Sequence, residues 1–282
     1  MKNRVSLRAT LLAVAIGLGA VSGAQAASTW VFSDSGANTS NPGNNIAKTS
    51  YSTSETTLNI SGAYAANDNS GNWNTTTSNS GSSATLVYYG GSGLGMNSDG
   101  NTSPNHAIDN NVNTEAVLLS FGQSVVLTSI GIGWNGGNDS DISLFRYVGT
   151  STPPANLNTV GSSLTSMVSA GWELVDNYAN LNVDTNAPFT SVNSANSSSS
   201  WWLISAFNND YRQAGDSGIA HGNDYMKIYG VTSNCTITNS NGSCGGGGTP
   251  STSVPEPASL ALVAIGMLGV AGVRRRKATA AI

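Results

Sequence analysis

Residues 115–134 read EAVLLSFGQSVVLTSIGIGW, a run rich in β-branched and other apolar side chains. Within it, residues 129–134 alternate between small residues and isoleucine or tryptophan, the period-two pattern of a strand with one buried face. Gly122-Gln123 interrupts the run, and we expect a tight turn there between strands at 115–121 and 125–134. The stretch therefore predicts neighbouring β-strands.

Comparable short runs recur along the chain, separated by clusters of Gly, Asn, Ser and Asp. No segment between residues 27 and 233 shows sustained helical periodicity. Nine short strands with turn punctuation predict an all-β fold, an antiparallel β-sandwich of the jelly-roll type. The seven further expected strands are 29–33, 56–64, 84–89, 142–148, 172–178, 201–207 and 225–231.

Charge is scarce and unevenly placed. Only 9% of the 282 residues are charged, against roughly 25% in an ordinary globular protein. Residues 27–254 hold fourteen acidic and four basic residues, so this segment carries a net charge of −10. A domain so poor in lysine and arginine cannot neutralise many phosphates. The balance argues against a nucleic-acid partner and is compatible with divalent cations or sugars.

The first 26 residues have the pattern of a secretory signal peptide. An apolar run over residues 9–20 precedes the small-x-small cleavage pattern of Ala24-Gln25-Ala26. An uncleaved membrane anchor is the alternative, but the run is short for a spanning helix. We therefore expect export through the Sec machinery. The basic residues before the apolar run are Lys2, Arg4 and Arg8.

The C-terminal end combines helix breakers, an apolar span and a basic stop. Pro255 and Pro257 prevent a helix from extending upstream, and residues 259–273 carry no charge. Fifteen helical residues reach about 23 Å, short of a membrane core of about 30 Å. The following cluster would stay on the cytoplasmic side, so the segment predicts a transient membrane helix. The basic cluster is Arg274, Arg275, Arg276 and Lys277.

Together, Pro255-Glu256-Pro257, the apolar span and the arginine cluster resemble a PEP-CTERM sorting signal over residues 254–278. The resemblance implies an exopolysaccharide-producing Gram-negative bacterium and processing by exosortase, a membrane-embedded cysteine enzyme. It also implies an inner-membrane intermediate on the way to the cell surface or medium. The PEP residues would be the enzyme's substrate site. An ordinary C-terminal membrane anchor is the alternative.

A second resemblance concerns residues 105–231, which are similar to discoidin-like, galactose-binding jelly rolls. It rests on an A-x-D turn at 106–110, a strand ending in Phe-Gly at 117–122, and a closing strand ending in aromatic-Gly at 226–231. The resemblance supports the fold more than any ligand, because such folds carry many functions.

The two cysteines, Cys235 and Cys244, follow the β domain in a Thr/Asn/Ser/Gly stretch. In an oxidising compartment we expect a local disulfide, with two free thiols as the alternative. The expected organisation is a signal peptide, a β domain, a disulfide loop with a flexible linker, and a sorting signal that contains the membrane helix. These segments are 1–26, 27–233, 234–253 and 254–278, with the helix at 259–273.

Two oxygen-rich loops, 67–72 and 138–141, suggest calcium as a cofactor, because calcium prefers carboxylate, amide and carbonyl oxygens. The candidate ligands are Asp139 and Asp141 of the second loop, and the loop around Asp109 is a further candidate. Neither loop has the EF-hand spacing, and solvated turns are the alternative reading.

Four tryptophans could form a sugar platform, although aromatic residues of sandwich strands are more often core. Trp201 and Trp202 are adjacent, so they must point to opposite faces of a strand. We expect one of them in the core and the other near a surface. The remaining two tryptophans considered are Trp134 and Trp172.

Gly215-Asp216-Ser217-Gly218 resembles the nucleophile turn of chymotrypsin-like proteases, but Ile219 replaces that family's next glycine. A triad also needs an oriented histidine, and neither His106 nor His221 has that family's context. A serine hydrolase using Ser217 is therefore the weakest alternative, and we expect no enzymatic activity.

The leading hypothesis is a non-enzymatic surface or matrix protein that acts in an exopolysaccharide biofilm. The alternative is a carbohydrate-binding module, with or without calcium.

Overall fold

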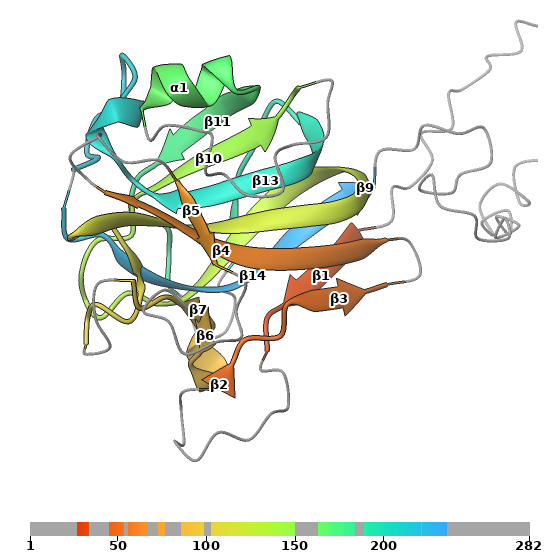
Figure 1. Cartoon of the computed structure of the whole chain (residues 1–282), viewed down its shortest axis with the longest axis horizontal. Coiled ribbons are helices and arrows are strands. Elements are labelled where there is room, and N and C mark those ends of the chain that lie inside the picture. Colours follow the sequence, from red (N-terminus) through yellow and green to blue (C-terminus); the bar gives the residue numbers. More distant parts are fainter. Residues whose placement is uncertain are drawn as a thin grey trace, which may run out of the picture.

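A computed structural model of the chain is mostly β, and its strands join into a single large antiparallel sheet (Figure 1). The all-β and antiparallel predictions are thereby confirmed. The described residues are 27–33, 45–53, 56–66, 73–76, 86–98, 103–149, 163–183, 189–220 and 222–235.

The strands are β1 (Ala27–Val31), β2 (Asn45–Ile46), β3 (Ser50–Ser52), β4 (Thr57–Ala66), β5 (Asn74–Thr76), β6 (Val87–Tyr88), β7 (Leu94–Gly95), β8 (Ile108–Asp109), β9 (Asn113–Trp134), β10 (Ile142–Tyr147), β11 (Trp172–Tyr178), β12 (Phe189–Ser191), β13 (Ser198–Ala206) and β14 (Tyr225–Cys235). The described helices are α1 (Leu164–Ser169), η1 (Gly90–Ser92) and η3 (Asn209–Tyr211). Ser163 caps α1, because its side chain accepts the N–H of Ser166.

The tight turn predicted at Gly122-Gln123 is wrong, because both residues lie inside the longest strand, β9. β9 runs through Gly122 without reversing: residues 113–121 pair with β4, and residues 125–134 pair with β14. β13 pairs with both halves of β9, and its register shifts between Ser199 and Trp201, where the pairing passes from one half to the other. A Cβ on Gly122 would lie 2.8 Å from Thr57 Oγ1. Glycine therefore allows the close approach of β4 rather than a hairpin.

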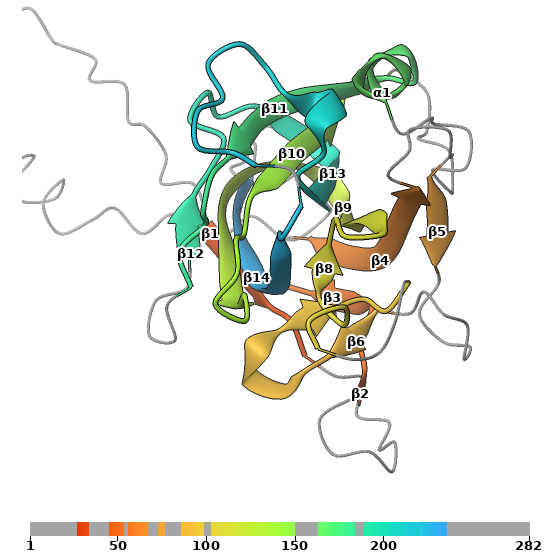
Figure 2. The ribbon, with the colours of Figure 1, turned by 90° about the vertical axis from the view of Figure 1, so that its left-hand side faces the viewer.

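This long strand also explains why the expected sandwich of two sheets is one connected sheet. The main strand order is β11-β10-β13-β9-β14-β7-β6-β2, with β4 and β1 joined to β9 and β14. Figure 2 shows the sheet curling around its interior. Because β9 has neighbours along both halves, hydrogen bonds continue where a sandwich would have a gap between sheets.

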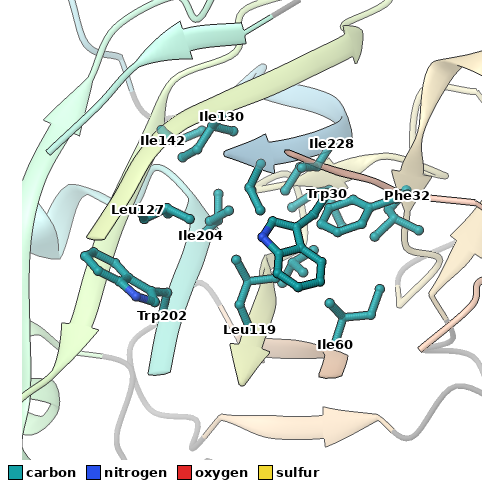
Figure 3. Packing of buried hydrophobic residues seen from close by; sticks show 14 of the residues in the cluster. Trp30, Phe32, Ile60, Leu119, Leu127, Ile130, Ile142, Trp202, Ile204 and Ile228 are labelled. Atoms are coloured by element: carbon teal, nitrogen blue, oxygen red, sulfur yellow. The ribbon is translucent and has the colours of Figure 1, made fainter. Parts of the chain in front are cut away.

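Both faces of the central strands are buried. Along β13, Trp202 and Ile204 enter the first core, whereas Leu203 enters the second. The first core also collects residues from β1, β4, β9, β10 and β14, such as Trp30 and Ile228 (Figure 3). The second core lies under α1, which packs along β11 (Figure 1). Trp202 is fully buried and Trp201 partly exposed, which confirms their expected opposite orientations.

The two ends of the β domain lie side by side. β1 begins at Ala27, the first residue after the expected signal cleavage, and pairs with β14 through Ala27 and Asn234. Trp30 anchors β1, because its Nε1 donates to Ser233 Oγ at 2.9 Å. β14 continues to Cys235, two residues past the expected domain boundary.

In the described part of the chain, no helix is both long enough and apolar enough to cross a membrane. The expected signal helix and the membrane helix at 259–273 lie outside the described residues.

Candidate site at the Asp139, Asp141 and Asp224 carboxylates

Three carboxylates meet where two strands begin. Asp141 directly precedes β10, and Asp224 directly precedes β14. The backbone of Asp139 bridges to the same place: its N–H donates to Asn223 O at 3.1 Å, and its carbonyl accepts the Tyr225 N–H at 3.0 Å. One carboxylate oxygen from each aspartate lies within 4.8 Å of the others. We call these three residues the acidic cluster.

Asp141 is fully buried and ties two separate segments to the start of β10. One carboxylate oxygen accepts the N–H of Asn180, just after β11, at 2.7 Å. The other accepts the N–H of Ala220, in the loop before β14, at 2.9 Å. Asp141 thus holds loops of distant sequence at one edge of the sheet.

Asp224 is also fully buried and joins the cluster to β8 and β13. One of its oxygens accepts the Asp141 backbone N–H at 2.9 Å, and the other accepts the side-chain amide of Asn110. That amide also donates to Phe207 O at 2.7 Å. Sequence reasoning missed Asp224, and the only local signal was the Gly-Asn pair that precedes it as a turn before a strand.

The acidic cluster has no basic counter-charge among the described residues, where the one ion pair joins Arg146 to Glu173 at 2.9 Å. Burial, with a smaller contribution from the neighbouring carboxylates, raises the pKa of Asp224 to about 8 against the opposing effect of its hydrogen bonds. Burial likewise raises the pKa of Asp141 to about 6, with a contribution from Asp139. At neutral pH the acidic cluster therefore either retains a proton or gains stability from a cation.

Chemically, the acidic cluster offers the oxygen ligands that calcium prefers. Each carboxylate oxygen that accepts one N–H bond keeps further lone-pair capacity. Of the three predicted ligands, Asp139 and Asp141 lie together, whereas Asp109 is not part of the cluster. Asp109 lies in β8, and its Oδ1 accepts the Asn111 N–H at 3.0 Å. Calcium binding stays a prediction, and residues 67–72 lie outside the described residues.

The tryptophans expected for a sugar platform separate into two groups. Trp172 and Trp202 are buried in the two cores, so they cannot contact a ligand at the surface. Trp201 and Trp134 are partly exposed, and Trp134 lies at the end of β9. These two are therefore the tryptophans of the four that can meet a sugar.

Ser217 is exposed on the loop before β14. Its neighbour Asp216 accepts hydrogen bonds from the Asn177 side chain and the Gln213 N–H, both at 2.7 Å. His106 lies elsewhere, with its ring centre 4.7 Å from that of Tyr89. No hydrogen bond joins Ser217 to His106 within the described part of the chain, and His221 lies outside it. Absence of enzymatic activity stays an expectation.

Cys235 ends β14, buried, and its Sγ accepts a hydrogen bond from Gln123 Nε2 at 3.3 Å. Because Cys244 lies outside the described residues, no disulfide joins two described residues and the bond stays a prediction. The other sequence-predicted processing residues also lie outside them: Ala24, Ala26, Pro255, Glu256, Pro257, Arg274, Arg275, Arg276 and Lys277.

Comparison with known protein families identifies the tail. Residues 253–277 match the PEP-CTERM protein-sorting motif, the segment in which the sequence predicted it. The chain therefore carries this sorting motif, which implies an exported, surface-associated protein that is sorted and processed by an exosortase. No curated protein and no solved structure matches the chain. The likeness of residues 105–231 to discoidin-like jelly rolls accordingly stays a prediction.

Proposed function

We propose that this chain is a non-enzymatic component of an exopolysaccharide matrix, delivered to the cell surface or the medium after exosortase processing. The observation that carries the proposal is the sorting motif at residues 253–277. The low charge content of the chain supports it, because amide and hydroxyl groups hydrate a surface that must work among polysaccharides.

The arrangement of the β domain supports this proposal. Ala27 and Asn234 are paired, so the chain enters and leaves the domain at one edge. The acidic cluster lies at the opposite end of β14, whose eleven residues span about 33 Å. The acidic cluster is therefore far from the place where the chain leaves the domain toward its sorting signal.

The test is the fate of the tail in the native host. We expect the intact mass of the exported protein to correspond to a chain that begins at Ala27 and lacks the apolar segment. Replacing Glu256 with alanine should leave the protein in the inner-membrane fraction with its tail uncut. The matched control is Pro250→Ala, a change in the linker just outside the motif. Equal processing of the Glu256→Ala variant and the wild type would contradict the proposal.

A second candidate function is a carbohydrate-binding module on a jelly-roll-like sheet, with calcium as a cofactor. The observation that favours it is that a partly exposed tryptophan and the acidic cluster adjoin the same part of β14: Trp134 pairs with Lys227, and Asp139 bridges to Asp224, three residues earlier on the chain. Titrating exported protein with matrix polysaccharide, with calcium and then with chelator, tests it. Binding that a chelator abolishes supports a calcium-dependent module, whereas no binding in either condition contradicts it.

A further inference from the structure

Lys227 is a buried lysine surrounded by aromatic rings. It lies on β14 opposite Trp134, and 3% of its surface is exposed. Its Nζ lies 3.3 Å from the centre of the Trp134 ring and 4.7 Å from that of Tyr89. The His106 ring lies between these two, with its centre 4.7 Å from that of Tyr89 and 5.5 Å from that of Trp134. We call these four residues the Lys227 box.

Two buried polar atoms in the Lys227 box lack hydrogen-bond partners, and the Lys227 ammonium beside them lies against aromatic rings. Tyr89 Oη and His106 Nδ1 are buried and make no hydrogen bond. Lys227 Nζ makes neither an ion pair nor a hydrogen bond with any described residue. Buried polar atoms are nearly always hydrogen-bonded, so two unpaired atoms beside an ammonium that lies against aromatic rings indicate a missing partner.

The electrostatics indicate which charge that partner carries. Burial lowers the pKa of Lys227 to about 7, because no anion compensates the ammonium. Burial and then the charge of Lys227 lower the pKa of His106. The charge of Glu115 adds to the effect of burial in raising the pKa of Tyr89 to about 12. The two carboxylate oxygens of Glu115 accept the backbone N–H groups of Ser98 and Asp109 at 3.0 and 3.3 Å.

The Lys227 box also reaches the surface. Tyr89, His106 and Trp134 are each partly exposed, so the Lys227 box lies at the edge of the core and not in its centre. Two glycines allow the backbone segments around the box to lie close together. A Cβ on Gly95 would lie 2.1 Å from His106 O, and one on Gly133 would lie 2.4 Å from Ser92 O. The backbone segments that carry the rings are thus packed closely against one another.

We propose that the Lys227 box binds a carboxylate carried on a sugar ring, that is, an acidic unit of a polysaccharide. The two carboxylate oxygens accept hydrogen bonds from Lys227 Nζ and Tyr89 Oη, which supplies the missing counter-charge. The sugar ring packs its C–H face on the exposed parts of Trp134 and Tyr89. A neutral sugar would leave the ammonium uncompensated. The proposal rests on the carbohydrate-binding candidate above and adds its residues and the charge of its ligand.

Calorimetric titration of the exported protein with glucuronate, glucose and acetate tests the proposal. Glucose carries the ring without the charge, and acetate carries the charge without the ring. We expect glucuronate to bind about tenfold or more tightly than either, the factor expected for one charge-assisted hydrogen bond. Glucose or acetate binding as tightly as glucuronate would overturn the proposal, as would no binding of any of the three because water alone fills the box.

Two variants and a control connect the binding to these residues. Lys227→Met keeps an unbranched side chain on the Trp134 ring and should lower glucuronate affinity at least about tenfold. Tyr89→Phe keeps the ring, removes only the hydroxyl, and should weaken binding without lowering the melting temperature. The control is Lys48→Met, because exposed Lys48 also lies over an aromatic ring, 4.9 Å from the centre of Tyr51. Wild-type affinity in Lys227→Met, or an equal loss in Lys48→Met, would overturn the assignment. Surface fractionation with intact mass tests the sorting function separately.

Discussion

If the carboxylates of the acidic cluster repel one another, removing one of their charges should stabilise the protein. Asp139→Asn removes one negative charge and keeps the side-chain oxygen: Asp139 Oδ1 accepts the N–H of its neighbour Ser140 at 2.8 Å, and an asparagine oxygen can accept the same bond. We therefore expect the variant to be more stable than the wild type at pH 8 when no divalent cation is present.

The magnitude follows from the 4.8 Å limit on the separations between the carboxylate oxygens. Two unit charges at that distance repel by about 3 kcal/mol at an effective dielectric constant of 20 and by about 1 kcal/mol in water. Asp139 is partly exposed, so the gain should fall between these values. For a domain of this size, the melting temperature should rise by roughly 2–12 °C.

The pH dependence checks the cause. Asp141 and Asp224 have pKa values raised from 3.8 to about 6 and about 8. Their protonated forms are favoured by folding, so the wild type loses stability as pH rises from about 4 through 8. At pH 4 both carboxyls are protonated in the folded protein, and the gain from Asp139→Asn should vanish.

Scanning calorimetry at pH 4 and pH 8, in chelator and in calcium, provides the readout. Calcium should raise the melting temperature of the wild type more than that of Asp139→Asn. The matched control is Asp176→Asn, because exposed Asp176 makes the same local bond to the next N–H at 2.9 Å but lies outside the acidic cluster. A lower melting temperature for Asp139→Asn at pH 8 in chelator, or the same shift at both pH values, would refute the repulsion.

Three further predictions concern the fold and the cysteines. Trp202→Ala should lower the free energy of unfolding by about 3–5 kcal/mol in urea titrations because Trp202 is fully buried, whereas Val168→Ala, at a residue 55% exposed, should change it by less than about 0.5 kcal/mol; similar losses would contradict the assigned core. Gly122→Val should lower the free energy of unfolding by about 1–3 kcal/mol in the same titrations by forcing β4 from β9. Gly91→Ala should lower it less, because the space around Gly91 is open, and no loss of stability in Gly122→Val would contradict the close approach. Exported protein should show no alkylation of Cys235 or Cys244 before reduction and two alkylated cysteines after it, and labelling before reduction would exclude the disulfide.

Strand positions were readable from local pattern, because the period-two alternation of side chains records which face of a strand is buried. The expected strand at 172–178 matches β11, and that at 142–148 matches β10 to within a residue. Very short strands such as β2 and β7 were missed, since two residues carry no periodicity. α1 was missed for a similar reason: six residues make fewer than two helical turns.

The turn expected at Gly122 failed for a different reason. Glycine in a strand run permits either a reversal or a close backbone approach, and local sequence does not distinguish them. Pairing of β9 with β4 and β14, whose residues are distant in sequence, decided for the close approach.

The candidate sites divide in the same way. Asp139 and Asp141 could be proposed from sequence because they are two residues apart in one polar loop, but Asp224 joins them only in the fold, through the Asp139 bridge and the Asp141 backbone N–H. The Lys227 box needed the fold entirely, since Tyr89, His106, Trp134 and Lys227 come from four separate segments. Nothing local marks a lysine whose counter-charge is absent.

By itself, the sequence determined the destination of this protein, because a sorting signal must be recognised in a linear segment and its breakers, apolar span and basic stop lie within 25 residues. It also determined the β class, since alternation and turn residues act over a few positions. Only the tertiary structure decided that the strands form one sheet and which charges are buried together. Those outcomes depend on pairing between residues far apart in the sequence, such as Asp141 and Asp224, which are 83 residues apart. The free energy of a buried charge also depends on neighbours that the linear order does not reveal.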